Sequence, residues 1–207
     1  MLRRALALLR RIGFDYTWFV VYSKALDRAG PASRATLPPG YRIAEVRTAD
    51  LVRSPHPELR NCRDYLGTDA VAFGVYRSDG VLVCVQFIWH GDRYRNVQFW
   101  PLKAREAASM HLICVEAERG KGLATCLKLD TAERMRERGF TRMYSRIWWT
   151  NTASRRVSER AGWARVGSVL EVKLPGMRAW RRFVCRRPVA PAFVEPMGAT
   201  TGTGRSR

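Results

Sequence analysis

The chain has 207 residues, of which 46% are hydrophobic, so it is long enough for one domain with extra segments and too apolar for disorder throughout. No apolar run approaches the roughly 18–20 residues that a membrane-spanning helix requires. The net charge of +19 favours a polyanionic partner, such as a nucleotide cofactor, an anionic lipid or a nucleic acid.

The basic residues are mostly arginine, because lysine occurs only at positions 24, 103, 121, 128 and 173. Such a skew also arises from a GC-rich genome, so it says little about a binding surface. No helix-turn-helix, RNP or zinc signature accompanies the charge, and we therefore expect no specific nucleic-acid binding.

The cysteines, at positions 62, 84, 114, 126 and 185, show no CxxC spacing. We interpret them as buried, reduced thiols and expect no metal site.

Residues 1–39 are expected to be an amphipathic and aromatic extension followed by a linker. Residues 2–12 show a helical pattern with arginines clustered on one side, and residues 14–22 form an aromatic, β-branched run typical of a strand or a second buried segment. Two roles stay open for residues 2–22. They either pack on the chain's own domain or form a peripheral contact with a membrane or a partner.

The first nine residues resemble a signal peptide only superficially. Arg10 and Arg11 interrupt the apolar stretch, and no small-residue cleavage site follows. We therefore expect a cytoplasmic protein, with peripheral membrane association left open.

Beyond residue 40 the hydrophobic pattern alternates between strands and helices. The expected strands cover residues 41–46, 71–76, 81–89, 110–115, 140–149, 164–174 and 177–185, and the expected helices cover 58–66, 123–138 and 152–160. Residues 98–102 are a further short strand or an active-site loop. This order predicts an α/β domain over residues 40–187. A loose tail, rich in proline, glycine and threonine, is expected over residues 188–207.

The most informative stretch is a strand, a glycine-bearing loop and a helix over residues 110–138. Unpaired backbone N–H groups at a helix N-terminus converge on an anion, and the helix dipole adds favourable potential. Gly120 and Gly122 allow the backbone to approach a phosphate, while Arg119 and Lys121 add positive charge. The spacing is not that of a Walker A loop, nor does it follow a first strand as a dinucleotide fingerprint does. We interpret residues 119–124 as a pyrophosphate cradle.

These residues resemble a known family. Arg119-Gly120-Lys121-Gly122-Leu123-Ala124 matches the R/Q-x-x-G-x-G/A motif of the GCN5-related N-acetyltransferases (GNATs). Residues 151–163, which read NTASRRVSERAGW, are similar to the N-x-x-A-x-x-x-Y-x-x-x-G-F segment of that family, with Ser154 in place of alanine and Trp163 in place of phenylalanine. Residues 40–43 look like its first strand. The resemblance covers roughly residues 40–186 and implies a mixed central sheet of six to seven strands flanked by helices.

The resemblance implies a set of residues that bind acetyl-CoA or another acyl-CoA as co-substrate. The cradle would hold the pyrophosphate, the strand backbone would hold pantetheine and polarise the thioester carbonyl, and Asn151 would touch the pantetheine arm. Asn151 is also suited to cap the following helix, and the two roles can coexist. The expected cofactor-binding residues are Ile113, Cys114, Val115, Arg119, Gly120, Lys121, Gly122, Leu123, Ala124, Thr125 and Asn151.

The chain departs from the family pattern at Ser158, where many members have a tyrosine that protonates the leaving thiolate. Serine is a much poorer proton donor, so that role is unfilled or has moved, and Tyr144 is a candidate stand-in. The loop between Val115 and Arg119 also looks one residue shorter than usual. The candidates for a general base are Glu106, His111 and Glu116, of which Glu106 is the first choice.

We therefore expect an N-acyltransferase that transfers an acetyl group to a primary amine of a small molecule or peptide by direct attack on the thioester. Two alternatives remain: an enzyme that uses longer acyl chains at a membrane, and a CoA-binding regulatory module without catalysis. A homodimer is left open.

Overall fold

The structure is a computed structural model that describes residues 15–26, 36–173, 176 and 179–187. The expected amphipathic helix at residues 2–12, residues 27–35 of the expected extension and linker, and the tail at residues 188–207 lie outside the described residues. Within the described part, no helix is long and apolar enough to cross a membrane.

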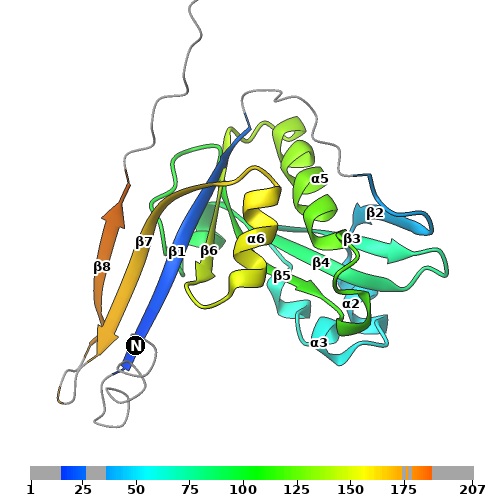
Figure 1. Ribbon diagram of the computed structural model, residues 1–207, viewed down its shortest axis with the longest axis horizontal. Helices are drawn as coiled ribbons and strands as arrows, with labels where there is room; N and C mark the ends of the chain where they lie inside the picture. The colour runs from blue at the N-terminus through cyan, green and yellow to red at the C-terminus, as the bar shows by residue number, and fades with distance from the viewer. Residues whose placement is uncertain (1–14, 27–35, 174–175, 177–178, 188–207) are drawn as a thin grey trace, which may run out of the picture.

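One eight-stranded mixed sheet organises the molecule (Figure 1). Its strand order is β2-β3-β4-β5-β6-β1-β7-β8, in which β5 and β6 are parallel and all other neighbours are antiparallel. The strands are β1 (Asp15–Ala25), β2 (Tyr41–Glu45), β3 (Ala70–Arg77), β4 (Leu82–Trp89), β5 (Glu106–Cys114), β6 (Arg142–Trp148), β7 (Ala164–Lys173) and β8 (Arg181–Arg186).

Strand β1 lies in the interior of this sheet, between β6 and β7. On one side it pairs with β6, in a register that runs from Phe19 opposite Trp148 to Ala25 opposite Arg142. On the other side it pairs with β7. Its apolar run is buried at successive positions from Val20 to Tyr22, as a strand covered on both faces requires. The sheet thus extends across the expected boundary at residue 40. The expected count of six to seven strands is corrected to eight because this N-terminal strand joins the sheet.

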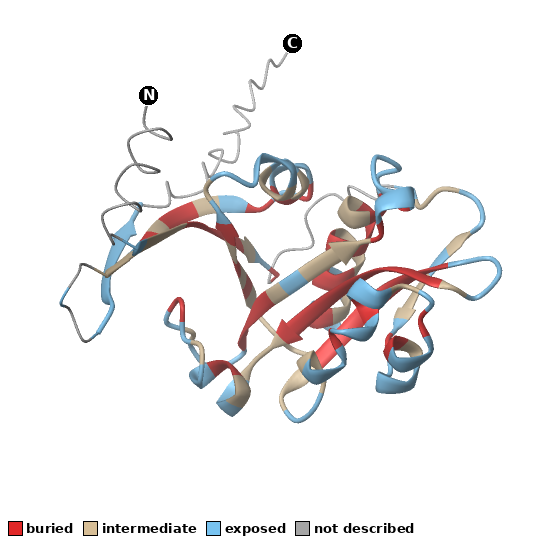
Figure 2. Cartoon of the chain, turned by 90° about the horizontal axis from the view of Figure 1, so that it is seen from below, coloured by how far each residue is buried: buried red, intermediate tan, exposed pale blue. Residues whose placement is uncertain are grey.

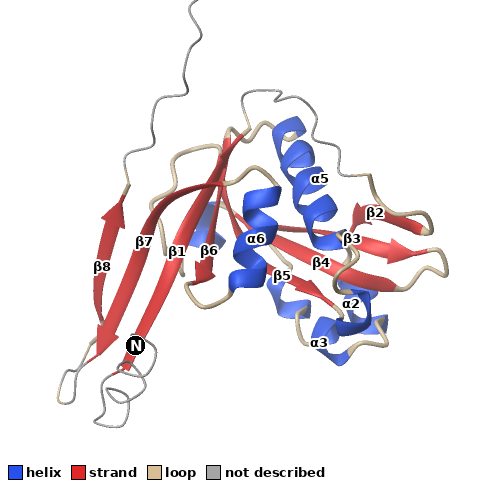
Figure 3. Cartoon of the chain, in the orientation of Figure 1, coloured by secondary structure: helices blue, strands red, loops and turns tan. Residues whose placement is uncertain are grey.

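The helices lie on both faces of the sheet (Figure 3). They are α2 (Thr48–Arg53), α3 (Pro57–Arg60), α4 (Gly91–Arg95), α5 (Leu123–Glu137) and α6 (Thr152–Arg160), with short 3-10 turns η1 (Arg63–Tyr65) and η2 (Glu116–Glu118). The single helix expected at residues 58–66 is divided into α3 and η1. Helix α4, which no sequence pattern predicted, buries Tyr94, while residues 98–102 form neither helix nor strand.

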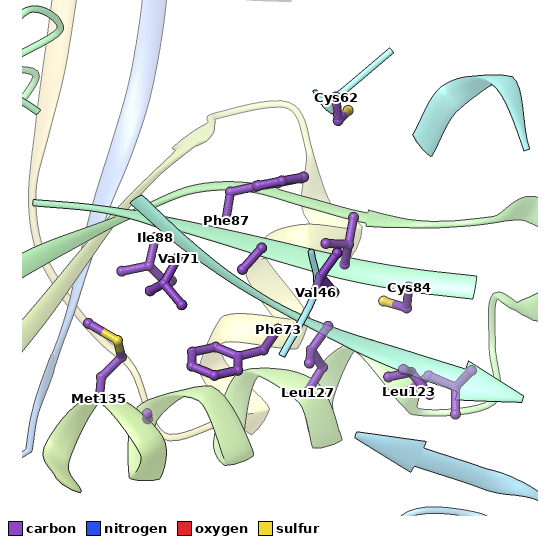
Figure 4. Packing of buried hydrophobic residues seen from close by; sticks show 14 of the residues in the cluster. Val46, Cys62, Val71, Phe73, Cys84, Phe87, Ile88, Leu123, Leu127 and Met135 are labelled. Carbon is purple, nitrogen blue, oxygen red and sulfur yellow. The ribbon is translucent and has the colours of Figure 1, made fainter. Parts of the chain in front are cut away.

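Most of the core lies between α5 and the sheet. Figure 4 shows Leu123, Leu127 and Met135 of α5 against one face of β3 and β4, with Phe87 and Cys62 on the opposite face. A second, smaller cluster joins β1 and β7 to Tyr94 and Trp100. Buried residues run along the strands, while the loops at their ends are largely exposed (Figure 2). The core therefore fixes β5 and α5 relative to one another, and these two elements carry the candidate site.

Candidate functional site

Strands β5 and β6 are paired at one end and separated at the other. Their parallel pairing runs only from Glu106 with Arg142 to Ser109 with Ser145, although both strands continue further. The register of β5 against β4 shifts at this point, because Phe87 pairs with His111 whereas Ile88 pairs with Ser109, leaving Met110 as an extra residue. Such a bulge bends a strand and ends local pairing. Figure 1 shows the two strands diverging, so beyond Ser109 the edge of β5 that faces β6 pairs with no strand among the described residues.

A cavity of about 390 Å³ occupies the opening between the two strands. Residues of the sheet and of both covering layers line it, namely Phe19, Tyr65, Trp89, Val97, Ser109, Met110, His111, Leu112, Lys128, Ser145, Arg146, Ile147, Trp148, Asn151, Ser154 and Ser158. The lining therefore combines aromatic side chains with a few polar groups, as small-molecule sites do. A larger cavity of about 530 Å³ lies near α4 and the start of β5, away from the glycine loop.

The glycine loop follows β5 and η2 and opens α5, as the sequence predicts. Gly120 and Gly122 have φ values of +82° and +80°, and a Cβ at either position would meet nothing within 4 Å. Within the described part of the chain, no acceptor takes a hydrogen bond from the backbone N–H groups of residues 120–124. The first-turn donors that are satisfied belong to Thr125 and Cys126, which both bond to the Gly122 carbonyl. An exposed row of unpaired N–H groups at a helix N-terminus is an anion-binding geometry.

The charged side chains of the loop form hydrogen bonds within the chain. The Lys121 ammonium donates to the buried Glu118 carboxylate at 2.7 Å and lies 3.2 Å from the Tyr41 hydroxyl. The Arg119 guanidinium donates to the Cys114 carbonyl at 3.1 Å, at the end of β5. Lys121 and Tyr41 together hold the pKa of Glu118 below its usual value. Both charges are therefore already engaged within the chain, whereas the backbone N–H groups of residues 120–124 are not.

The second predicted motif begins helix α6 at the cavity. The Asn151 side chain accepts a hydrogen bond from the Ser154 backbone N–H at 3.0 Å, which confirms its capping role. Ser158 is buried, and its hydroxyl donates to the Ser154 carbonyl at 3.1 Å. This hydroxyl is therefore engaged by the helix backbone.

The two candidates Glu106 and Tyr144 lie together outside the described lining of the 390 Å³ cavity, and Glu106 lines the larger cavity of about 530 Å³. The Glu106 carboxylate accepts a hydrogen bond from the Lys103 backbone N–H at 2.8 Å and lies 3.4 Å from the Tyr144 hydroxyl. It also faces Arg142 at 3.7 Å. Burial raises the pKa of Tyr144, and the nearby carboxylate adds to that effect. These contacts give Glu106 a role in closing the turn before β5.

His111 is the candidate base that reaches the cavity. Its ring stacks on Tyr65 with centroids 5.2 Å apart, on the sheet face that carries η1. Desolvation lowers the pKa of His111, so the neutral imidazole is favoured. Glu116 is exposed in η2 and is not among the described residues that line this cavity.

Solved structures with similar folds include three that cover most of the chain. A tandem GNAT protein from the clavulanic acid biosynthesis pathway, without acetyl-CoA, has a TM-score of 0.57 at 15% sequence identity. The match covers 84% of this chain and 59% of that structure's chain. A GCN5-related N-acetyltransferase from Sphaerobacter thermophilus has a TM-score of 0.54 at 18% sequence identity. The match covers 84% of this chain and 58% of that structure's chain. A Drosophila protein has a TM-score of 0.55 at 17% sequence identity, and the match covers 83% of this chain and 56% of that protein's chain. No family model and no curated protein matches the sequence.

The chain has the fold of the GCN5-related N-acetyltransferases. The predicted fold class is thereby confirmed, with a larger strand count. This chain spans between 56% and 59% of the length of those three structures.

In this fold the glycine loop follows β5 and opens α5, while Asn151 opens α6 and lines the cavity between β5 and β6; residues 119–124 are not among the described residues of that lining. The fold also brings in Lys128, which was not among the residues expected from the sequence. Lys128 shares the inner face of α5 with Thr131 and Met135 at helical spacing, and its side chain is 2% exposed. A lysine on the apolar face of an amphipathic helix was the sequence signal for this residue.

Proposed function

We propose that the chain is a GNAT enzyme that binds acetyl-CoA and transfers its acetyl group to a primary amine of a small molecule or peptide. The row of unpaired N–H groups at residues 120–124, next to the open edge of β5, is the observation that carries this proposal. The row suits a pyrophosphate, and a free strand edge suits the amide groups of pantetheine. The cavity beyond leaves room for an acyl group and an amine.

When bound, the thioester supplies an activated acyl carbonyl for attack by the amine. Backbone groups of β5 near Ile113 to Val115 hold the pantetheine arm and polarise that carbonyl as fixed dipoles. His111, whose lowered pKa favours the neutral imidazole, accepts the proton that the substrate ammonium must lose before attack. Asn151 contributes an amide at the same cavity while it caps α6.

A second candidate function is a CoA-binding module without turnover. The observation that favours it is the Ser158 hydroxyl, which is buried and donates to the Ser154 carbonyl. A hydroxyl bound in this way does not protonate a leaving thiolate. The module predicts CoA binding with no acetyl transfer to any amine.

Two measurements on the full chain test these functions. CoA and acetyl-CoA should raise the melting temperature, because a ligand that binds the native state stabilises it by RT ln(1 + [L]/Kd). Thiol release from acetyl-CoA should then depend on added amine, measured with a panel of small amines and peptides and with acyl-CoAs of increasing chain length. Stabilisation by CoA without amine-dependent thiol release supports the module. Absence of any CoA-dependent shift contradicts both functions.

A further inference from the structure

Lys128 is a buried cation at the cavity between β5 and β6. It projects from α5, is 2% exposed and lines the cavity together with Ser154 and Ser158 of α6. Its ammonium lies 3.9 Å from the centroid of the Trp163 ring. Within the described residues it has no carboxylate partner and makes no hydrogen bond, unlike Lys121. A buried ammonium without an anion is costly to retain, so a purely structural role at this position would be filled better by an apolar side chain.

The charged groups around Lys128 do not neutralise it. From β1, Lys24 repels it, although the Lys24 ammonium itself donates to the Ala161 carbonyl at 2.7 Å. From α6, the Glu159 carboxylate accepts the hydrogen bond of the Tyr22 hydroxyl at 2.7 Å, and the Arg155 guanidinium donates to that hydroxyl at 3.3 Å.

Among the described residues of the cavity lining, two further groups carry charge when protonated, His111 on β5 and Arg146 on β6. Burial, followed by repulsion from Lys24, lowers the pKa of Lys128 to about 7. Both protonation states are then populated near neutral pH, as proton transfer requires.

His111 and Lys128 approach the cavity from opposite faces of the sheet. His111 pairs with Phe87 and stacks on Tyr65 of η1, on the face away from α5 (Figure 4 shows Phe87 there). Lys128 comes from α5 itself. Two titratable groups whose environments differ, one on each side of a reacting centre, suit one proton acceptor and one proton donor.

We propose that the Lys128 ammonium is the proton donor to the sulfur that leaves during acyl transfer, an inference that rests on the proposed function. The amine nitrogen forms a bond to the acyl carbon, and the carbon–sulfur bond breaks with its electron pair staying on sulfur. Lys128 gives that sulfur a proton and becomes a neutral amine. The proton that the attacking amine loses passes through His111 or water to solvent, and Lys128 is reprotonated from solvent, so the cycle is balanced.

The matched variants are Lys128→Met and Lys173→Met. Methionine keeps the length and apolar stem of Lys128 without its charge, and Lys173, at the end of β7, lies outside the cavity and cradle. Both variants should fold and be stabilised by CoA. Acetyl transfer in Lys128→Met should fall by roughly 10²-fold or more, the range for loss of a general acid, and its rate should lose the alkaline limb of the wild-type pH profile. Lys173→Met should match the wild type in rate and profile.

A readout without turnover tests the same contact. The ultraviolet absorbance of the CoA thiolate, followed against pH in the complex, should show a lower thiol pKa in the wild type than in Lys128→Met, because the ammonium stabilises the thiolate. The lysine Cε resonances of protein labelled with ¹³C-lysine, assigned through Lys128→Met, should include one that titrates near neutrality and moves on addition of CoA.

The outcomes separate this inference from the proposed function. The donor role alone is overturned if the wild type transfers acetyl and Lys128→Met shows the same rate, pH profile and thiol titration. An acetyl group found on Lys128 by peptide mass spectrometry after mixing with acetyl-CoA also overturns it, since the residue would then be an acceptor. A wild type that neither binds CoA nor transfers acetyl overturns the proposed function and this inference with it.

Discussion

The Lys121 ammonium and the Glu118 carboxylate, 2.7 Å apart, face one another behind the glycine loop. Glu118 is buried, and its second hydrogen bond comes from the Tyr41 hydroxyl at 2.6 Å. With Tyr41, this pair fastens the loop to β2 and engages the lysine charge in an ion pair within the chain. The cradle therefore presents backbone dipoles to an anion, and substitutions in the loop can separate that backbone contribution from the charge of the side chains.

Gly122→Val should abolish stabilisation by CoA while the protein stays folded. Valine at a φ of +80° is strained, and its side chain would occupy the open space where the backbone meets the anion. Gly80→Val is the matched control, since Gly80 has a φ of +83°, equally open surroundings and a position in the turn between β3 and β4. Thermal shifts with CoA should be lost only in Gly122→Val. Equal stabilisation of both variants would contradict the cradle assignment.

Lys121→Ala should lower protein stability more clearly than it lowers CoA affinity. Removing the ammonium leaves the buried Glu118 carboxylate with less compensation, whereas the N–H row stays in place. Chemical unfolding and calorimetric titration with CoA measure the two effects. A large loss of CoA affinity with unchanged stability would show that the lysine, and not the backbone, binds the phosphates.

The contribution of Glu118 to stability should disappear in acid. Its pKa is lowered in the folded chain, so its favourable contribution is present in full above the unfolded value of about 4.3 and is lost as the pH falls through the folded value. The difference in unfolding free energy between the wild type and Glu118→Gln should therefore shrink below about pH 4.3. A difference that is constant over the acid range would mean that the carboxylate gains nothing from Lys121 and Tyr41.

Lys128→Met should stabilise the protein, most strongly at and below neutral pH. The folded pKa of about 7 lies below the unfolded value of about 10.4, so folding disfavours the ammonium, and wild-type stability rises with pH between these values. A tenfold change in an acid dissociation constant corresponds to about 1.4 kcal/mol, so the expected gain at pH 7 is on the order of a few kcal/mol. Unfolding curves from about pH 6 to 10 should show the two proteins converging as the pH rises. Parallel curves would contradict the burial of a Lys128 ammonium that has no carboxylate partner within the described residues.

Asn151 combines two roles that different substitutions separate. Asn151→Ala should cost about 1 kcal/mol of stability through loss of the α6 cap. Asn151→Asp keeps a capping oxygen but removes the amide donor, so it should retain stability and weaken CoA binding if the amide contacts pantetheine. Chemical unfolding and calorimetric titration with CoA measure the two effects. If Asn151→Asp binds CoA with full affinity, the amide does not contact pantetheine, and capping α6 is the role of Asn151 that remains.

The sequence by itself determined the local features. The glycine loop before an amphipathic pattern predicts an anion-binding helix N-terminus at α5, and an asparagine three residues before Ser154 predicts a capped helix at α6. Both depend on hydrogen bonds and backbone angles within a few residues, which is why the sequence carries them. The alternation of apolar runs likewise predicts most strands, including the aromatic run that forms β1.

Only the tertiary structure decided what lies beside these features. The place of β1 between β6 and β7 depends on pairing with segments more than a hundred residues away, and no local pattern encodes such pairing. The bulge at Met110 separates β5 from β6, and this opening is what brings His111 and Lys128 to one cavity while Glu106 stays in the paired end. Burial then sets the pKa of Lys128, because the cost of a charge depends on surroundings that are assembled only when distant segments pack together.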